Sequence, residues 1–212
     1  SGMNLFINLY KSHNHIRQKE IDYCLQKNMD NPLIDVYVMN EGVALPSHIN
    51  QRFVTKRPTY NDMFEWANEV GGISIIANND IFFDESIALA ENILDGECYA
   101  LTRYNVEAGL ESKIGGSQDV WIFKDTIKVD APFNMGILGC DNRVAYEIDK
   151  AGYFVTNPAK DIITYHYHKS NHRTYSKENK IPPPYKIIPI TKQYQKKRVL
   201  HFALGTDQLA ME

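Results

Sequence analysis

Short apolar segments alternate with amphipathic segments through most of the chain, and this alternation limits the possible folds more than any other feature. Segments 4–9, 34–39 and 73–77 are short and mainly apolar, as buried strands are. Between them, segments 15–27 and 59–70 carry apolar residues near helical spacing. Strands that alternate with helices predict an α/β protein whose central sheet is mostly parallel and flanked by helices.

Residue types that cap helices mark where the predicted helices begin and end. Thr59, with Asp62 three residues later, is typical of a helix N-terminus, and Gly71 is typical of a helix end. Ser86 and Asp141 are predicted to cap two later helices. The other predicted strands are 98–103, 119–123 and 162–167. Ligands of such sheets bind outside the carboxyl ends of the strands, so polar residues at that edge are the first candidates for a site.

The composition excludes several classes of protein. With 43% hydrophobic and 23% charged residues, a packed core is expected. The formal net charge of −3 argues against a protein that binds nucleic acid mainly through phosphates. No apolar run approaches the ~20 residues that a membrane span needs. Three widely spaced cysteines and the absence of a signal peptide predict reduced thiols and a cytoplasmic protein.

Charge is unevenly distributed along the chain. Residues 1–168 hold 14 Lys and Arg against 23 Asp and Glu, a net of −9. Residues 169–198 hold 9 basic residues and a single acidic one, Glu178. An anionic ligand or partner near this basic stretch would explain it, and so would a solvated, lysine-rich surface. The sequence leaves both interpretations open.

A change in composition near residue 179 predicts a domain boundary. Residues 179–212 are rich in proline and lysine without clear periodicity, which is typical of an arm or linker. We therefore expect one folded domain over residues 4–178, preceded by a start at residues 1–3 that looks like a remnant of expression. The arm is expected to lead to a further region of a longer, multidomain chain.

The run Asn78-Asn79-Asp80 directly follows the apolar segment 73–77. This position places the Asp80 carboxylate at the edge of the sheet where ligands bind. A carboxylate there could hold Mg²⁺ or Mn²⁺, which suit carboxylate ligands and bridge to phosphate oxygens. The alternative is an ordinary turn in which Asn and Asp side chains bond their own backbone.

A glycine-containing loop at 115–118 delivers Asp119 to the start of another apolar segment. A carboxylate in that place could act as a general base, which takes a proton from an attacking hydroxyl group. The alternative is a polar residue that caps the strand or forms a turn.

Histidines and cations gather at the last predicted strand. His166 and His168 are two residues apart, so they point to the same face of a strand and form a plausible metal-binding pair. Lys169 and Arg173 supply positive charge suited to a pyrophosphate. The alternative is a group of neutral histidines and solvated cations on the surface.

These three motifs, in this order, resemble the GT-A family of nucleotide-sugar glycosyltransferases, a single-domain, Rossmann-like fold. The resemblance covers roughly residues 4–175. It implies that Leu9, Tyr10 and Lys11 lie in the strand and loop that cup the nucleotide base. It also implies that Asn78-Asn79-Asp80 stands where the family has its Asp-x-Asp metal motif. Because the first position is Asn, weaker metal binding or more reliance on histidine is expected.

The resemblance implies further contacts. A late histidine, His166 or His168, would complete the metal site with Asp80, and Asp119 would be the base. The loop that contains Gly136 would line the donor sugar, although a tight turn explains it equally well. The residues that would lie beside the nucleotide or its phosphates are Arg57, Asn79, Asp80, His168, Lys169 and Arg173. Arg57 is equally well explained as an ordinary surface charge.

The implied function is metal-dependent transfer of a sugar from a nucleoside-diphosphate sugar to a hydroxyl group of a glycan or glycoprotein acceptor. Uridine diphosphate is the favoured nucleotide, Mn²⁺ or Mg²⁺ the expected cation, and inversion the favoured stereochemistry. Viral members of the family that glycosylate capsids are similar, which implies the cytoplasm of a host cell. Two other interpretations stay open, a non-catalytic module that binds nucleotide sugars or glycans and a His-x-His metallohydrolase.

Overall fold

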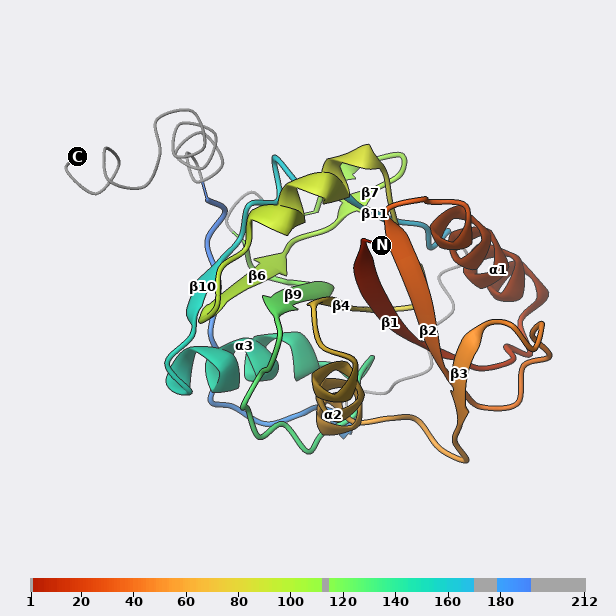
Figure 1. Ribbon diagram of the computed structural model, residues 1–212, viewed down its shortest axis with the longest axis horizontal. Helices are drawn as coiled ribbons and strands as arrows, with labels where there is room; N and C mark the ends of the chain where they lie inside the picture. Colours follow the sequence, from red (N-terminus) through yellow and green to blue (C-terminus); the bar gives the residue numbers. More distant parts are fainter. Residues whose placement is uncertain (1, 112–114, 170–178, 192–212) are drawn as a thin grey trace.

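The computed structural model describes residues 2–111, 115–169 and 179–191 (Figure 1). Its main sheet has seven strands in the order β10-β6-β9-β4-β1-β2-β3. These strands are β1 (Met3–Leu9), β2 (Ile34–Asn40), β3 (Asn50–Phe53), β4 (Ile73–Ala77), β6 (Glu97–Leu101), β9 (Val120–Lys124) and β10 (Phe154–Thr156). The predicted α/β class with a mostly parallel sheet is confirmed.

One strand of the main sheet runs against the others. Four of the neighbouring pairs are parallel, whereas β9 is antiparallel to both β4 and β6. Ala77, the last residue of β4, therefore pairs with Val120, the first residue of β9. As a result, the residue before β9 lies at the same edge of the sheet as the residues after β4.

A small second sheet has the strand order β5-β11-β7-β8. Its strands are β5 (Ile81–Phe83), β7 (Tyr104–Asn105), β8 (Gly109–Leu110) and β11 (Thr164–His166). Strand β11 pairs antiparallel with β5, so that His166 is opposite Ile81. This pairing brings a residue from late in the chain beside the segment that follows β4.

Helices cover both faces of the main sheet (Figure 1). The helices are α1 (His15–Met29), the 3₁₀-helix η1 (Glu85–Asn92), α2 (Tyr60–Val70) and α3 (Cys140–Lys150). Apolar residues of α1 and η1 belong to one buried cluster, and those of α2 and α3 belong to a second cluster on the other face. No helix in the described part of the chain is long and apolar enough to cross a membrane.

The predicted start of α2 is confirmed, and the predicted start of the next helix is wrong. Thr59 accepts a hydrogen bond from the backbone N–H of Asp62, and the Asp62 carboxylate accepts one from the backbone N–H of Thr59. At η1 the capping residue is Asp84, whose side chain accepts from the backbone N–H of Ser86. Ser86 instead lies inside the first turn. Both residue types cap helices well, so local sequence does not separate them.

The predicted cap of α3 is also wrong. Gly139 precedes the helix with φ of 84°, a left-handed conformation that favours glycine, and its position has no side-chain cap from the residues described. Asp141 is in the first turn, where its carboxylate accepts from the backbone N–H of Gln118 at 3.1 Å. A long-range contact has therefore replaced the local cap.

Part of the predicted C-terminal arm packs against the body of the protein. The backbone N–H of Ile181 donates to the carbonyl of Leu138 at 2.8 Å, and that of Thr191 donates to Asn157 at 2.8 Å. Ile188 is buried in the same apolar cluster as α2 and α3. Residues 180–191 thus lie on the body of the protein and do not extend from it, while residues 192–212 lie outside the described part.

Candidate functional site

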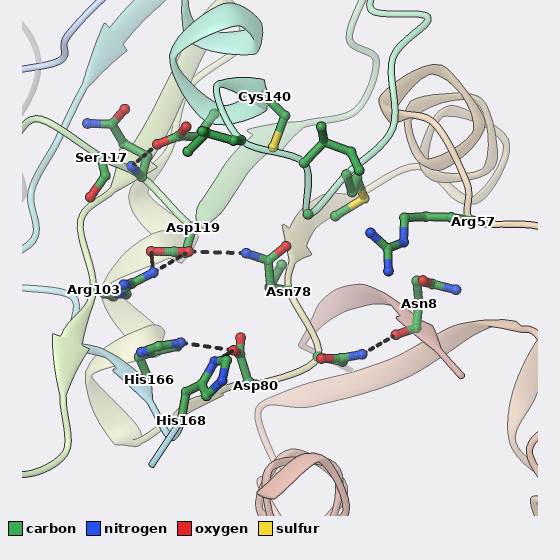
Figure 2. Close-up of a pocket in the computed structure, with 18 of the residues that line it drawn as sticks. Asn8, Arg57, Asn78, Asp80, Arg103, Ser117, Asp119, Cys140, His166 and His168 are labelled. Carbon is green, nitrogen blue, oxygen red and sulfur yellow. Dashed lines mark hydrogen bonds and ion pairs between the residues drawn. The ribbon is translucent and has the colours of Figure 1, made fainter. Parts of the chain in front are cut away.

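An open cavity of about 350 Å³ lies at the edge of the main sheet where β4 ends and β9 begins (Figure 2). The residues around it come from segments that are far apart in the sequence. Eight of the residues predicted to form a site line this cavity, and they are Tyr10, Arg57, Asn79, Asp80, Asp119, Gly136, His166 and His168. The structure therefore brings the three predicted motifs together.

Asp80 is at the centre of a buried polar cluster at one end of the cavity. Its Oδ2 atom lies 2.8 Å from Nη2 of Arg17, 2.9 Å from Nε2 of His166 and 3.4 Å from Nδ1 of His168. All four side chains are almost fully buried. Figure 2 shows both imidazoles turned toward the carboxylate.

Backbone contacts explain why these side chains meet. The chain turns after β4, and the backbone N–H of Tyr167 donates to the carbonyl of Asp80 at 2.9 Å. Asn79 donates from its side chain to the carbonyl of Asn8 at 3.1 Å, which holds the turn against the end of β1. Hydrogen bonds on both sides therefore hold the segment after β4 in place.

The surroundings of Asp80 favour its charged form. Burial alone raises the pKa of this carboxyl, but His166, His168 and Arg17 hold the pKa well below its usual range. Asp80 is therefore a permanent anion at neutral pH, as a cation ligand must be.

The donor atoms of the Asp80 cluster fit a divalent cation. One carboxylate oxygen of Asp80 and one ring nitrogen from each of His166 and His168 lie within 4.8 Å of one another. The second oxygen of Asp80, Oδ1, is buried and has no hydrogen-bond partner among the residues that the structure describes. Two imidazoles and one carboxylate suit Mn²⁺ or Zn²⁺ better than Mg²⁺, which prefers oxygen ligands.

Asp119 lies beside the Asp80 cluster but has different partners. Nη1 of Arg103 is 3.2 and 3.3 Å from the two carboxylate oxygens, and the side chain of Asn78 donates to Oδ1 at 3.1 Å. The antiparallel orientation of β9 puts Asp119 next to Asn78, because Val120 and Ala77 are paired. The predicted base thus faces the cavity, with hydrogen bonds from two side chains.

Asp141 is a third carboxylate at the cavity, and the sequence-based prediction did not assign it to the site. Burial, together with the negative charge of Asp119, raises its pKa to about 6. A group with a pKa near neutrality is suited to proton transfer. One feature of the sequence could have indicated Asp141 as a site residue. The predicted sugar loop, which contains Gly136 and Gly139, ends two residues before it, at the start of a helix.

Arg57 and Tyr10 form the opposite wall of the cavity. The guanidinium of Arg57 lies over the ring of Tyr10, 5.6 Å from its centre. Gly136 has φ of 70°, and a Cβ atom at this position would lie 3.5 Å from Nη1 of Arg57. Asn134 donates from its side chain to the carbonyl of Arg57 at 2.9 Å. The predicted sugar loop and Arg57 are therefore held together.

Three other predicted site residues, Leu9, Lys11 and Lys169, do not line this cavity. The Leu9 side chain is 1% exposed and packs in the core, and Lys11 is exposed to solvent outside the cavity. Nζ of Lys169 lies 2.7 Å from the exposed carboxylate of Glu107, also outside the cavity. The family resemblance suggested Leu9 and Lys11, and positive charge suggested Lys169, but these side chains lie in the core or in solvent. Arg173 lies outside the described residues.

Comparison with known proteins finds no family model that matches this chain and no match among curated proteins. The class of protein is therefore defined by its fold and its site. It is an α/β protein with a buried Asp-His-His cluster and two further aspartates in a cavity at the edge of a mostly parallel sheet.

Proposed function

We propose that this protein is a GT-A-like glycosyltransferase that moves a sugar from a nucleoside-diphosphate sugar, with uridine diphosphate favoured, to a hydroxyl group of a glycan acceptor. The observation that carries the proposal is a cavity lined by both a candidate cation site and the carboxylates of Asp119 and Asp141. This cavity lies at the edge of the sheet where ligands bind in open α/β proteins.

The donor would lie between the Asp80 cluster and Arg57. Asp80, His166 and His168 would hold a divalent cation, for which Mn²⁺ suits the two imidazoles. A divalent cation supplies positive charge that stabilises the leaving diphosphate. Tyr10 offers an aromatic face for the nucleoside, and Arg57 offers a charge-assisted hydrogen bond to phosphate or ribose.

Two carboxylates compete for the role of base. The sequence predicts Asp119, but Arg103 and Asn78 already donate hydrogen bonds to its carboxylate oxygens. Asp141 has a pKa of about 6, close to the range in which a general base works best. These surroundings favour Asp141 as the group that accepts the acceptor's proton and Asp119 as the group that positions Arg103. Attack from the face opposite to the diphosphate, with one base, gives inversion.

Titration calorimetry tests the donor site directly. We expect uridine diphosphate to bind in the presence of Mn²⁺ and to bind much more weakly when the cation is removed by a chelator. A panel of uridine-diphosphate sugars with simple glycan acceptors would then identify the transferred sugar. Absence of any nucleotide binding, with and without Mn²⁺, would contradict the proposal.

A metallohydrolase is the second candidate, because an Asp-His-His set also occurs around hydrolytic metal ions. This candidate predicts tight Zn²⁺ binding that does not respond to nucleotide and hydrolysis of simple esters or phosphoesters. The glycosyltransferase predicts cation binding that strengthens with uridine diphosphate. A non-catalytic binding module predicts nucleotide-sugar binding without cleavage of the donor.

A further inference from the structure

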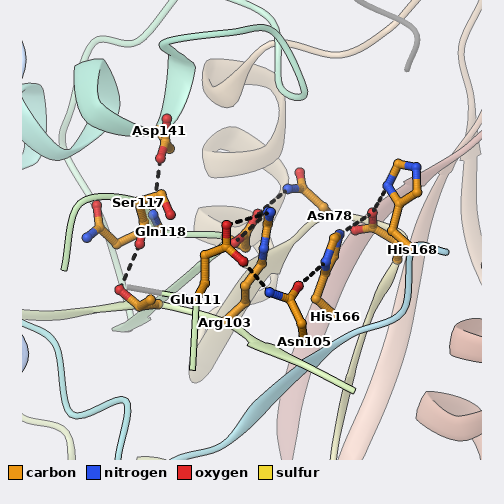
Figure 3. Close-up of polar contacts among 12 residues, drawn as sticks. Asn78, Arg103, Asn105, Glu111, Ser117, Gln118, Asp141, His166 and His168 are labelled. Atoms are coloured by element: carbon orange, nitrogen blue, oxygen red, sulfur yellow. Dashed lines mark hydrogen bonds and ion pairs between the residues drawn. The ribbon is translucent and has the colours of Figure 1, made fainter. Parts of the chain in front are cut away.

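The ring of His166 is held from both of its nitrogen atoms. Nε2 faces Oδ2 of Asp80 at 2.9 Å, and Nδ1 faces Oδ1 of Asn105 at 2.9 Å (Figure 3). Asn105 ends β7, which pairs parallel with β11 so that Asn105 and His166 are in register. The small sheet therefore provides a backbone reason for this contact.

Asn105 has a second partner that determines which way its amide points. The Nδ2 atom of Asn105 donates to the carboxylate of Glu111, which follows β8 in the same hairpin. A carboxylate accepts hydrogen bonds and has none to donate, so the amide nitrogen must face Glu111. The amide oxygen is then left to face His166, and it too is an acceptor.

This orientation determines where the ring proton of His166 lies. Because Oδ1 of Asn105 only accepts, Nδ1 of His166 must carry a hydrogen. In a neutral ring, Nε2 is then the atom with the lone pair. That lone pair faces Oδ2 of Asp80, so two acceptors oppose each other unless a proton or a cation lies between them.

Glu111 also connects this hairpin to the other end of the cavity. One of its oxygens lies 3.6 Å from Nη2 of Arg103. Arg103 in turn contacts Asp119 through Nη1 at 3.2 Å. Asn105 and Arg103 therefore hold the Glu111 carboxylate between them, and these two contacts fix its orientation toward Asn105.

We propose that Asn105 and Glu111 are positioning residues for the cation site, which keep the proton of His166 on Nδ1 and leave Nε2 to bind the metal. The proposal rests on the cation site of the proposed function. A partner on the second nitrogen of a metal-binding histidine sets its tautomer and orientation, and loss of such a partner typically weakens metal binding about 10–100-fold.

The binding test uses the full chain with Zn²⁺ or Mn²⁺ alone, without nucleotide. Asn105→Ala is expected to weaken cation binding about 10–100-fold in titration calorimetry. Glu111→Leu is expected to weaken it in the same direction, because the Asn105 amide is then free to turn over. Glu111→Gln keeps an acceptor oxygen for the amide and is expected to bind the cation as the wild type does.

Glu107→Leu is the matched control, because Glu107 is an exposed carboxylate of the same hairpin that pairs with Lys169 and not with Asn105. Cation affinity should not change in this variant. Circular dichroism and thermal unfolding of every variant would confirm that each one folds, and the partly exposed position of Glu111 makes its variants informative even if Asn105→Ala fails to fold.

The second readout is the ¹⁵N spectrum of the histidine rings with Zn²⁺ bound. We expect the wild type to show His166 coordinated through Nε2 with a proton on Nδ1, and Glu111→Leu to show a mixture of the two ring forms. Coordination of wild-type His166 through Nδ1, or unchanged affinity in both Asn105→Ala and Glu111→Leu, would overturn the proposal. A protein that binds Zn²⁺ in this way but transfers no sugar would contradict the proposed function and leave this inference standing.

Discussion

Asp80 and Asp141 line the same cavity, yet their surroundings shift their pKa values in opposite directions. Desolvation raises both pKa values. At Asp80 the effects of His166, His168 and Arg17 outweigh desolvation, so that the pKa falls well below its usual range. At Asp141 the neighbouring charge of Asp119 adds to desolvation, and the pKa rises to about 6.

This difference assigns different chemistry to the two ends of the cavity. A carboxylate that stays charged at all physiological pH values can bind a cation but is a weak proton acceptor. A carboxylate with a pKa near 6 can take and release a proton at neutral pH. Residue type is the same at both ends, so the neighbours decide what each aspartate is able to do.

The largest effect is expected at Asp80. Asp80→Ala removes the carboxylate ligand and leaves Arg17 and two imidazoles, so Mn²⁺ binding should fall below detection and transfer should be lost with it. Titration calorimetry with Mn²⁺ in the presence of uridine diphosphate measures this. Asp22→Ala, at an exposed position of α1, is the control and should bind as the wild type does. Retained Mn²⁺ affinity in Asp80→Ala would mean that the Asp-His-His cluster is not the cation site.

The strands that position the site could be predicted from sequence because each one is a short, strongly apolar segment. Segments 73–77 and 119–123 are recognisable in this way and correspond to β4 and β9, and their polar residues Asp80 and Asp119 are therefore predicted at the ligand edge. In the described part of the chain, five strands were not predicted, and they are β3, β5, β7, β8 and β10. They are between two and four residues long, too short for an alternating pattern to be recognised.

The partners of the site residues could not be predicted. Arg17 is one of several polar residues in α1, and no local pattern shows that it reaches Asp80, 63 positions later. The contact of Asn105 with His166 depends on the pairing of β7 with β11, and the contact of Arg103 with Asp119 depends on the pairing of β6 with β9. Asp141 was predicted to be a helix cap because that local use of aspartate is common. Contacts between distant segments decide each of these cases.

The next largest effect separates the two candidate bases. Asp141→Asn should cut sugar transfer about 10²–10⁴-fold while donor binding is retained, because an amide cannot accept the proton. Asp119→Asn should have a smaller effect, about tenfold, through displacement of Arg103. Steady-state transfer rates and donor affinity would be measured for both variants. The reverse order of the two effects would identify Asp119 as the base, as the sequence alone predicts.

The pH dependence of wild-type transfer provides an independent check on the base. A base with a pKa of about 6 is protonated below that pH, so the transfer rate should fall as the pH decreases through about 6. The residual activity of Asp141→Asn should not show this decrease in rate near pH 6. A wild-type profile that stays level down to pH 5 would contradict the role of Asp141.

Titration of Asp141 should also change the free energy of unfolding. The direction is opposite to that of a carboxylate whose pKa is lowered by folding. The pKa of Asp141 is raised from 3.8 to about 6, so between these pH values the folded state binds more protons than the unfolded state. The free energy of unfolding should therefore decrease by up to about 3 kcal/mol as the pH rises across this window. Urea unfolding of the wild type and Asp141→Asn at pH 4.5 and pH 7.5 measures the difference, since the variant lacks this contribution.

The smallest effect is expected from substitution of the positively charged side chains that the sequence predicts beside the phosphates. Arg57 lines the cavity, so Arg57→Ala should weaken binding of uridine diphosphate about tenfold through loss of a charge-assisted hydrogen bond. Lys169 is half exposed and pairs with Glu107 outside the cavity, so Lys169→Ala should leave the affinity unchanged. Calorimetry would measure the affinity of both variants for uridine diphosphate at two salt concentrations. Salt weakens long-range attraction of an anion more than it weakens a direct contact with Arg57. Equal losses in the two variants would show that the phosphates are attracted by the summed positive charge and not by a contact with Arg57.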